Sequence, residues 1–187
     1  MNEQAFQILE FDKLRELLRR GAQTPMGHDR IEVLAPLANL PELNRELAAA
    51  AECEHARRRG VKWTFDELND PAEAIARLRV AGTALDPVTI LGLSRLCSQT
   101  LSARSSIMAE RDECPVLSEL VAGLPRELNS LVARIANKIL PTGELDDRAS
   151  PELARIRHDI ARLRSSITRS LESLMRRSEE AIQDELV

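Results

Sequence analysis

Aromatic residues are scarce in this chain of 187 residues: they make up 2% of it, and tyrosine is absent. Strands are enriched in aromatic and β-branched residues, so this scarcity argues against a fold built on sheets. It also leaves few rings that could stack on nucleic-acid bases. No stretch approaches the roughly 20 apolar residues of a membrane-spanning helix, and the N-terminus has no run of signal-peptide type. We therefore expect a soluble protein without a membrane partner.

Residues for chemistry are also few. The three cysteines are widely spaced, which fits neither a disulfide framework nor a Cys-x-x-Cys metal site, and a reducing cytoplasm is the simplest setting. The seven glycines form no phosphate-binding loop, and no metalloprotease or serine-hydrolase motif occurs. The three histidines, His28, His55 and His158, are scattered and are interpreted as surface residues. The sequence predicts no catalytic residue, no metal site and no cofactor in this chain.

Leucine, alanine and arginine dominate instead. Apolar residues make up 43% of the chain and charged residues 30%, a composition typical of helical bundles and coiled coils. The formal net charge is −4, which argues against attraction of nucleic acid by the whole surface but allows a local basic patch.

Proline and glycine divide the chain into helical segments. Several segments start with a short polar residue followed by proline, as at Thr24-Pro25 and Asp86-Pro87, although the third starts at Leu40-Pro41. Residues 141–147 predict a turn or a small hairpin. The expected helices cover residues 10–20, 25–35, 40–59, 71–81, 88–110, 117–124, 125–139 and 151–187. The sequence therefore predicts an all-α fold, with a helical bundle core over 1–149 and a long projecting helix of coiled-coil type over 150–187.

The last helix is the most distinctive element. Ser150-Pro151-Glu152 supplies a cap, a proline and an acid for its first turn, and neither glycine nor proline follows. A helix over 152–187 is about 55 Å long, so part of it must project from a domain of this size. Its apolar residues follow a heptad spacing with a stutter near Leu171. This seam predicts a partner helix or self-association, and it consists of Leu153, Ile156, Ile160, Leu163, Ile167, Leu171 and Leu174.

Arginines repeat every seven residues along the same helix. The stripe comprises Arg155, Arg162, Arg169 and Arg176, and the segment 155–177 carries seven positive and two negative residues. One interpretation is an edge that contacts nucleic-acid phosphates. The other is a solvated flank of a coiled coil, or ion pairing with acids of a neighbouring helix.

Two short motifs suggest binding, and each has a simpler explanation. Phe65-Asp66-Glu67 matches a Phe-x-Glu element with which some DNA-repair proteins stack on a mismatched base, but Phe65 beside Trp63 also fits a satellite core contact. Asp146 and Asp147, with Glu144, could hold a cation. A solvated turn ahead of a helix N-terminus explains the same acids.

The end of the chain lacks the usual signals for a helix C-terminus. Glu179, Glu180, Asp184 and Glu185 place negative charge at the end where the helix dipole favours positive charge. No capping glycine and no polar tail follow. We therefore expect the native polypeptide to continue past Val187.

Three segments resemble the second bacterial MutS family, the Smr-domain-bearing MutS paralogue. They are Leu9-Glu10-Phe11-Asp12-Lys13, then Thr24-Pro25-Met26-Gly27, and the segment 143–157, which reads GELDDRASPELARIR and leads into the heptad helix. The last segment is the strongest match. The order and length of the helices between these segments also agree, except over 50–70, so the resemblance covers nearly the whole chain.

The resemblance implies the N-terminal core, or lever, region of a clamp ATPase with an ascending lever helix. The ATPase and Smr domains of that family would lie beyond this chain, and with them ATP, Mg and any nuclease activity. Family members form homodimers, act on branched DNA to suppress recombination, and rescue collided ribosomes in the bacterial cytoplasm. This fragment would couple the nucleotide state to clamp movement. The alternative is a stand-alone helical scaffold that dimerises through its heptad helix.

Overall fold

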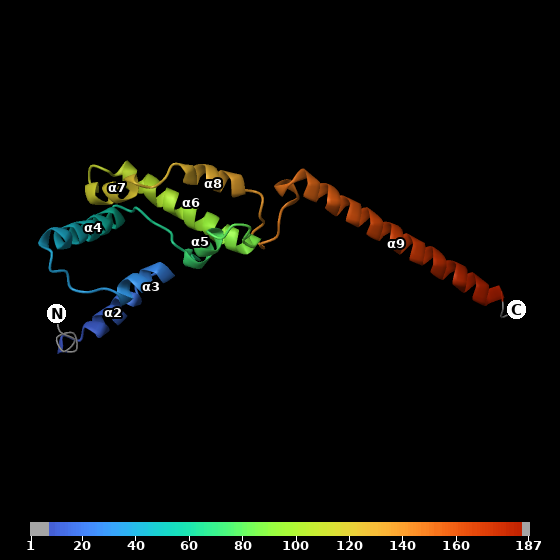
Figure 1. Ribbon diagram of the computed structural model, residues 1–187, viewed down its shortest axis with the longest axis horizontal. Coiled ribbons are helices and arrows are strands. Elements are labelled where there is room, and N and C mark those ends of the chain that lie inside the picture. Colours follow the sequence, from blue (N-terminus) through green and yellow to red (C-terminus); the bar gives the residue numbers. More distant parts are fainter. Residues whose placement is uncertain (1–7, 185–187) are drawn as a thin grey trace. The chain divides into compact units, whose positions relative to one another are not determined.

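The computed structural model describes the backbone of residues 8–184 and the side chains of residues 8–178. Over that range the chain is largely helical and has no β-strand, which confirms the predicted all-α class (Figure 1). The helices are α2 (Phe11–Arg19), α3 (Pro25–Glu32), α4 (Leu40–Arg58), α5 (Ala72–Leu78), α6 (Pro87–Ala109), α7 (Pro115–Ala122), α8 (Glu127–Ile135), the short 3-10 helix η1 (Asp147–Ala149) and α9 (Pro151–Asp184).

Polar caps followed by proline begin several helices, as the sequence predicts. The side chains of Thr24 and Asp86 each accept a hydrogen bond from the backbone N–H three residues later, at the starts of α3 and α6. The predicted start of α4 at Leu40 is right, but its cap is Asn39, whose side chain accepts from the N–H of Glu42. Leucine has no acceptor, so the residue before it takes that role.

The prediction of a helix over 125–139 is wrong at its end. Helix α8 ends at Ile135, and Asn137 adopts a left-handed backbone with φ of 62°. Asparagine tolerates this geometry, which stops a helix. Ile139 lies outside the helix and pairs with Leu145 in an isolated antiparallel bridge. Residues 138–146 thus form the small hairpin that the turn residues predict.

The chain divides into two compact units after Ala136. Unit 1, residues 1–136, holds α2 to α8. Unit 2, residues 137–187, holds the hairpin, η1 and α9. The sequence predicts a boundary between a core domain and a lever helix at residues 149 and 150, and this boundary stays a prediction.

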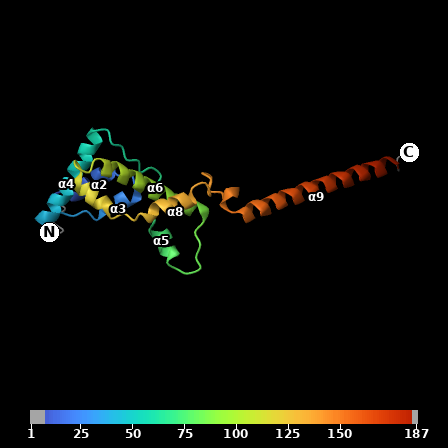
Figure 2. The ribbon, with the colours of Figure 1, turned by 90° about the horizontal axis from the view of Figure 1, so that it is seen from above.

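The buried core of unit 1 is small and lies where α4, α6 and α7 meet. The cluster there consists of Ala56, Ile107, Cys114 and Leu117, and Leu68 and Ala74 are buried outside it. Trp63 packs against this cluster, whereas Phe65, the predicted satellite contact, is half-buried outside it. Helix α6 also packs along α8 (Figure 2). Of the apolar residues on the inner side of α6, only Ile107 is buried, and most of the others are half-buried.

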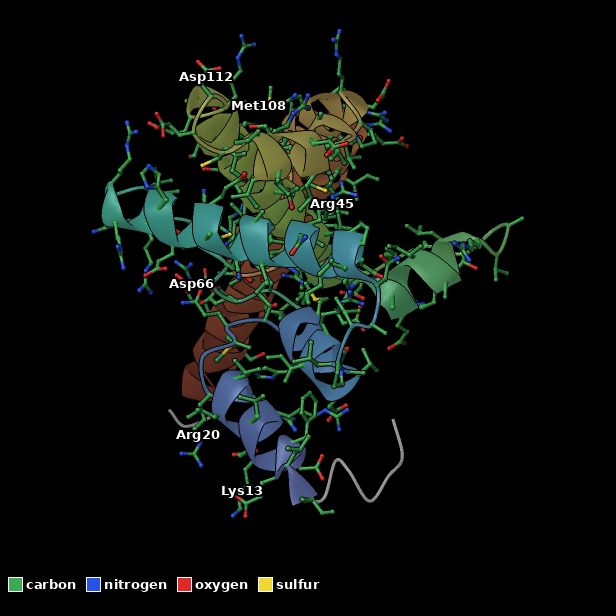
Figure 3. The ribbon with its side chains drawn as sticks, turned by 90° about the vertical axis from the view of Figure 1, so that its left-hand side faces the viewer. Lys13, Arg20, Arg45, Asp66, Met108 and Asp112 are labelled. Carbon is green, nitrogen blue, oxygen red and sulfur yellow. The ribbon has the colours of Figure 1, made fainter. Side chains whose placement is uncertain are left out.

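Helices α4 and α7 are joined by a carboxylate. Glu52 on α4 accepts backbone hydrogen bonds from Val116 at 3.0 Å and Leu117 at 2.9 Å, in the first turn of α7. The first N–H groups of a helix have no partner within it, so Glu52 caps α7 from a distant segment. Arg45, labelled in Figure 3, extends from α4 to pair with Glu119 at 3.3 Å.

Helices α2 and α3 form a separate pair within unit 1. They pack against each other, and the Arg15 guanidinium donates to the Leu34 carbonyl at 2.7 and 3.1 Å. Lys13 and Arg20 point outward from α2 in Figure 3. The α2 side chain of Leu17 is 64% exposed, so much of this apolar face is not buried.

Candidate interaction surface on the long helix

The first turns of α9 are tied to the hairpin before them. Arg157 donates to the Leu145 carbonyl at 2.8 Å and pairs with the Asp147 carboxylate at 2.5 Å. On the other side of η1, Asp146 accepts from the Arg148 backbone and guanidinium, and these bonds lower the pKa of Asp146 to about 2. Unit 2 therefore has a fixed helix base, and Arg157 is the residue that bonds α9 to it.

Sequence reasoning missed the role of Arg157. It lies in the segment 143–157 that resembles the MutS paralogue family, but nothing in the spacing shows which acid it meets. The partner, Asp147, is ten residues away across a 3-10 turn. That pairing depends on the path of the chain through η1.

The predicted seam lies on one face of α9 and is exposed within unit 2. Because each residue turns about 100° around an α-helix, its seven residues fall within a sector of about 80°. Leu153, nearest the base, is half-buried. The other six are between 44% and 60% exposed, namely Ile156, Ile160, Leu163, Ile167, Leu171 and Leu174. Its exposure agrees with a surface that is free to pair, and both the self-association and the coiled-coil pairing stay predictions.

The four stripe arginines lie on the other side of α9. At about 100° per residue, Arg155, Arg162, Arg169 and Arg176 fall within a sector of about 60°, centred about 150° from the centre of the seam. All four are exposed. Arg162 pairs weakly with Asp159 at 3.5 Å, and Arg169 donates to the Ser165 carbonyl at 3.2 Å. For Arg155 and Arg176 the described residues supply no ion pair.

This placement bears on one explanation for the stripe, namely ion pairing with acids of a neighbouring helix, and leaves the solvated flank and the phosphate contact open. A partner helix on the seam would be flanked by residues beside the seam, such as Arg157 and Arg164, because those positions border a coiled-coil interface. The stripe lies far from that border. Ion pairing with acids of a helix packed on the seam therefore does not account for it.

The acidic side chains of the two short motifs have partners within the fold. Asp146 pairs with Arg148, and Asp147 pairs with Arg157 in a largely exposed ion pair. Within residues 8–184, no cluster of three or more histidine, cysteine or acidic side chains could hold a metal ion. Glu67 of the Phe65-x-Glu67 element pairs with Arg95 on α6 at 2.5 Å. Its carboxylate is therefore engaged within the fold.

The histidines differ in their surroundings. The His28 ring lies 3.1 Å from the Ala22 carbonyl and holds the turn before α3. His55 on α4 lies 3.6 Å from Glu113, and His158 is exposed on α9. No two of them lie near one another in sequence or share a described partner.

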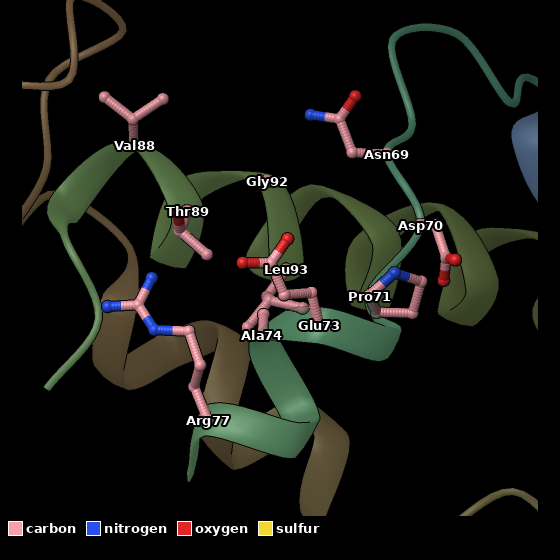
Figure 4. Close-up of a pocket in the computed structure, with 10 residues that line it drawn as sticks. All are labelled: Asn69, Asp70, Pro71, Glu73, Ala74, Arg77, Val88, Thr89, Gly92 and Leu93. Carbon is pink, nitrogen blue, oxygen red and sulfur yellow. The ribbon is translucent and has the colours of Figure 1, made fainter. Parts of the chain in front are cut away.

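A shallow pocket lies between α5 and α6 in unit 1 (Figure 4). It has a volume of about 210 Å³ and is lined by Asn69, Asp70, Pro71, Glu73, Ala74, Arg77, Val88, Thr89, Gly92 and Leu93. Several polar groups there already serve the fold: Asp70 accepts from the N–H of Ala72, and Thr89 donates to Asp86.

Across the described part of the chain, no helix is long and apolar enough to cross a membrane.

Three curated relatives share the name Endonuclease MutS2. The protein of Thermomicrobium roseum is 29% identical over 190 residues, covering 100% of this chain and 24% of the relative. That of Pelotomaculum thermopropionicum is 31% identical over 159 residues, covering 84% of this chain and 20% of the relative. That of Clostridium beijerinckii is 29% identical over 188 residues, with coverage of 100% and 24%. No family model matches the chain.

The chain thus spans between a fifth and a quarter of the length of these relatives. The similarity covers both units, since two of the three alignments include the whole chain. It agrees with the resemblance carried by the segment 143–157. The chain is accordingly related to one region of proteins named Endonuclease MutS2.

Proposed function

We propose that this chain is the N-terminal core and lever region of a MutS-like clamp ATPase, and that α9 is its ascending lever helix. In this role the chain couples the nucleotide state of an ATPase domain to opening and closing of a clamp. The parent protein would act on branched DNA, on ribosomes or on both, as a homodimer in the bacterial cytoplasm. ATP, Mg and any nuclease activity would belong to parts beyond this chain.

The observation that carries the proposal is the form of unit 2, together with the named relatives. Helix α9 is uninterrupted over Pro151–Asp184 and is bonded at its base through Arg157. At 1.5 Å per residue, its 34 residues extend about 51 Å. A rigid helix of that length converts a small rotation at its base into a large displacement at its tip.

The exposed seam fits a lever that pairs with another helix. Full burial of a leucine or isoleucine side chain contributes about 1.5–3 kcal/mol, so six exposed seam residues represent a substantial driving force for pairing. The seam also favours a second candidate, a stand-alone helical scaffold in which two copies pair through α9. The two candidates differ in what covers the seam: a helix of the same longer protein, or α9 of a second copy.

The coding sequence downstream of Val187 tests the proposal. A lever region predicts an open reading frame that encodes a G-x-x-x-x-G-K-[ST] loop within a few hundred residues. A stop codon directly after Val187 would overturn the proposal and favour the scaffold.

A second test uses the full-length protein and amide hydrogen exchange. Ile160→Asn with Leu163→Asn should lower protection along α9, because both side chains leave the paired seam. The matched control, Ser165→Asn with Thr168→Asn, changes the same helix off the seam and should leave protection unchanged. An ATP analogue should alter exchange along α9 in the wild type. Identical exchange with and without nucleotide would contradict the lever role.

A further inference from the structure

We propose that α9 pairs with α9 of a second copy of this chain as a parallel, in-register, two-stranded coiled coil. The paired surface is the part of the seam before the stutter, from Leu153 to Ile167. The inference rests on the pairing role that the proposed function gives the seam, and it adds the partner, the direction and the register. In a homodimeric clamp, the two levers would then run side by side in the same direction.

The two borders of the seam carry opposite charges. At about 100° per residue, Glu152 and Asp159 lie about 60–80° to one side of the centre of the seam. Arg157 and Arg164 lie at the same angles to the other side. Because each set repeats after seven residues, one border is acidic and the other basic over two heptads. The direction in which two such helices pair therefore decides whether opposite or like charges meet.

A parallel pair brings opposite charges together. In a parallel coiled coil, residues that border the seam on one side contact the other border of the partner helix, five positions further along. Glu152 then faces Arg157 of the second copy, and Asp159 faces Arg164 of the second copy. Symmetry doubles each of these two contacts, so four ion pairs flank the paired segment.

An antiparallel pair loses this match. Each border then faces the same border of the partner helix, so an overlap of the first heptads puts acids against acids and arginines against arginines. An overlap of the whole helix avoids this repulsion but places the polar Ser178 opposite Ile156. In the parallel, in-register pair, every apolar layer meets its own copy instead. The charges and the apolar layers thus favour the same direction.

The apolar residues of the segment also suit two strands. Parallel dimers favour a β-branched residue at the first apolar position of a heptad and leucine at the second. Ile160, Leu163 and Ile167 follow this rule. Leu153 and Ile156 reverse it, but Leu153 is half-buried at the base of α9 and has less surface to offer a partner.

The charged groups of the best contact are accessible. Arg164 is exposed, and the described residues supply no ion pair for it. Asp159 is paired weakly with Arg162 at 3.5 Å. Arg157 is already bonded to the base of α9, although only through its Nη1 atom. The contact between Asp159 and Arg164 is therefore the one to test, since neither residue holds the base.

The test is sedimentation equilibrium of the full 187-residue chain over a range of concentrations. Arg164→Glu turns two attractive contacts into repulsive ones and should raise the dimer dissociation constant about tenfold or more. Asp159→Arg with Arg164→Glu restores opposite charges across the interface and should return the constant to within about threefold of the wild type. Side chains that meet on one helix are three or four residues apart, so a rescue between positions 159 and 164 must come from a second helix.

The matched control is Arg169→Glu, which makes the same charge change on the side of α9 away from the seam. It should leave the dissociation constant unchanged. An equal loss in this control, or no rescue in the double variant, would overturn the proposal. So would a wild type that stays monomeric at about 1 mM, where even a weak complex forms, or one that assembles beyond a dimer.

A second measurement reports the direction of pairing. Ile160→Cys and Leu174→Cys chains are mixed in a glutathione redox buffer, and the disulfides are mapped by mass spectrometry of peptides. The parallel pair predicts disulfides that join residue 160 to 160 and residue 174 to 174. In an antiparallel pair these two layers face each other, so a disulfide between 160 and 174 would overturn the proposal.

This failure is distinguishable from failure of the proposed function. A disulfide between positions 160 and 174, or a monomeric wild type, overturns the parallel pair without touching the lever role. A stop codon directly after Val187 overturns the lever role, while the charge rescue and the 160-to-160 disulfide would still support the parallel pair.

Discussion

Two regions of the molecule are stabilised in different ways: the region where α4, α6 and α7 meet, which we call the joint, and the long helix α9. In the joint, the side chains of Ile107, Cys114 and Leu117 are buried, and a carboxylate from α4 caps α7 across more than 60 residues of sequence. Helix α9 has no fully buried side chain among its described residues, and its bonds to other segments lie at its base. The joint is held by tertiary contacts, and α9 by its own backbone and one short hairpin. The comparison indicates that unit 1 is stabilised by tertiary contacts, whereas α9 leaves its side chains exposed within unit 2.

The largest difference is expected when a leucine side chain is truncated to alanine in each of the two regions. Leu117→Ala should lower the free energy of unfolding by about 2–4 kcal/mol, because the side chain is 6% exposed and its loss leaves a cavity. Leu171→Ala in α9, where the side chain is 55% exposed, should cost less than about 1 kcal/mol. Urea denaturation followed by circular dichroism measures both. Equal losses would mean that the seam is already buried in the isolated chain.

The carboxylate cap offers the next largest effect. Glu52→Ala should destabilise the chain by about 1–2 kcal/mol, because two backbone donors in the first turn of α7 lose their acceptor. Glu54→Ala is the matched control on the same helix, since Glu54 forms only an exposed pair with Arg58. Urea denaturation again provides the measurement. A control loss as large as that of Glu52→Ala would show that helix α4, rather than the cap, is responsible.

The capping of α7 by Glu52 also shows which contacts cannot be predicted from the sequence. Helix starts at Thr24 and Asp86 are predictable because cap and proline are adjacent in the chain, and the seam of α9 is predictable because heptad spacing is local. Glu52 meets α7 only after the chain has folded, and one sequence gives no signal for a partner 64 residues away. The same reason hides the pairing of Arg157 with Asp147.

The prediction of where α8 ends was wrong for a different reason. The apolar pattern continues from Leu131 through Ile135 to Ile139, so periodicity alone extends the helix. The left-handed backbone of Asn137 interrupts that pattern and directs Ile139 into the hairpin. The arginine stripe can be predicted as a repeat of seven, but its position on the side of α9 away from the seam depends on an unbroken helical backbone.

A smaller effect is expected at the base of α9. Arg157→Gln should cost less than about 1 kcal/mol overall, because its pair with Asp147 is largely exposed. The local effect should be clearer: amide protection should fall in residues 139–146 and in the first turn of α9, while α6 keeps its protection. Arg164→Gln, one heptad further along the same helix, is the control. Hydrogen exchange by mass spectrometry measures the difference, and a uniform change across both units would contradict a local anchor.

The smallest effect is a pH dependence confined to the same base. Hydrogen bonds from Arg148 hold the pKa of Asp146 at about 2, below its ordinary value of 3.8. Between those two values the unfolded chain binds more protons than the folded one, so stability rises with pH in that window. The contribution is therefore complete above about pH 4 and is lost as pH falls through about 2. The Asp146 carboxyl signal in NMR should titrate near 2, whereas Arg148→Gln should return it toward its ordinary pKa. An unperturbed titration in the wild type would show that this ion pair does not persist in solution, and the fixed base of α9 would then depend on Arg157 alone.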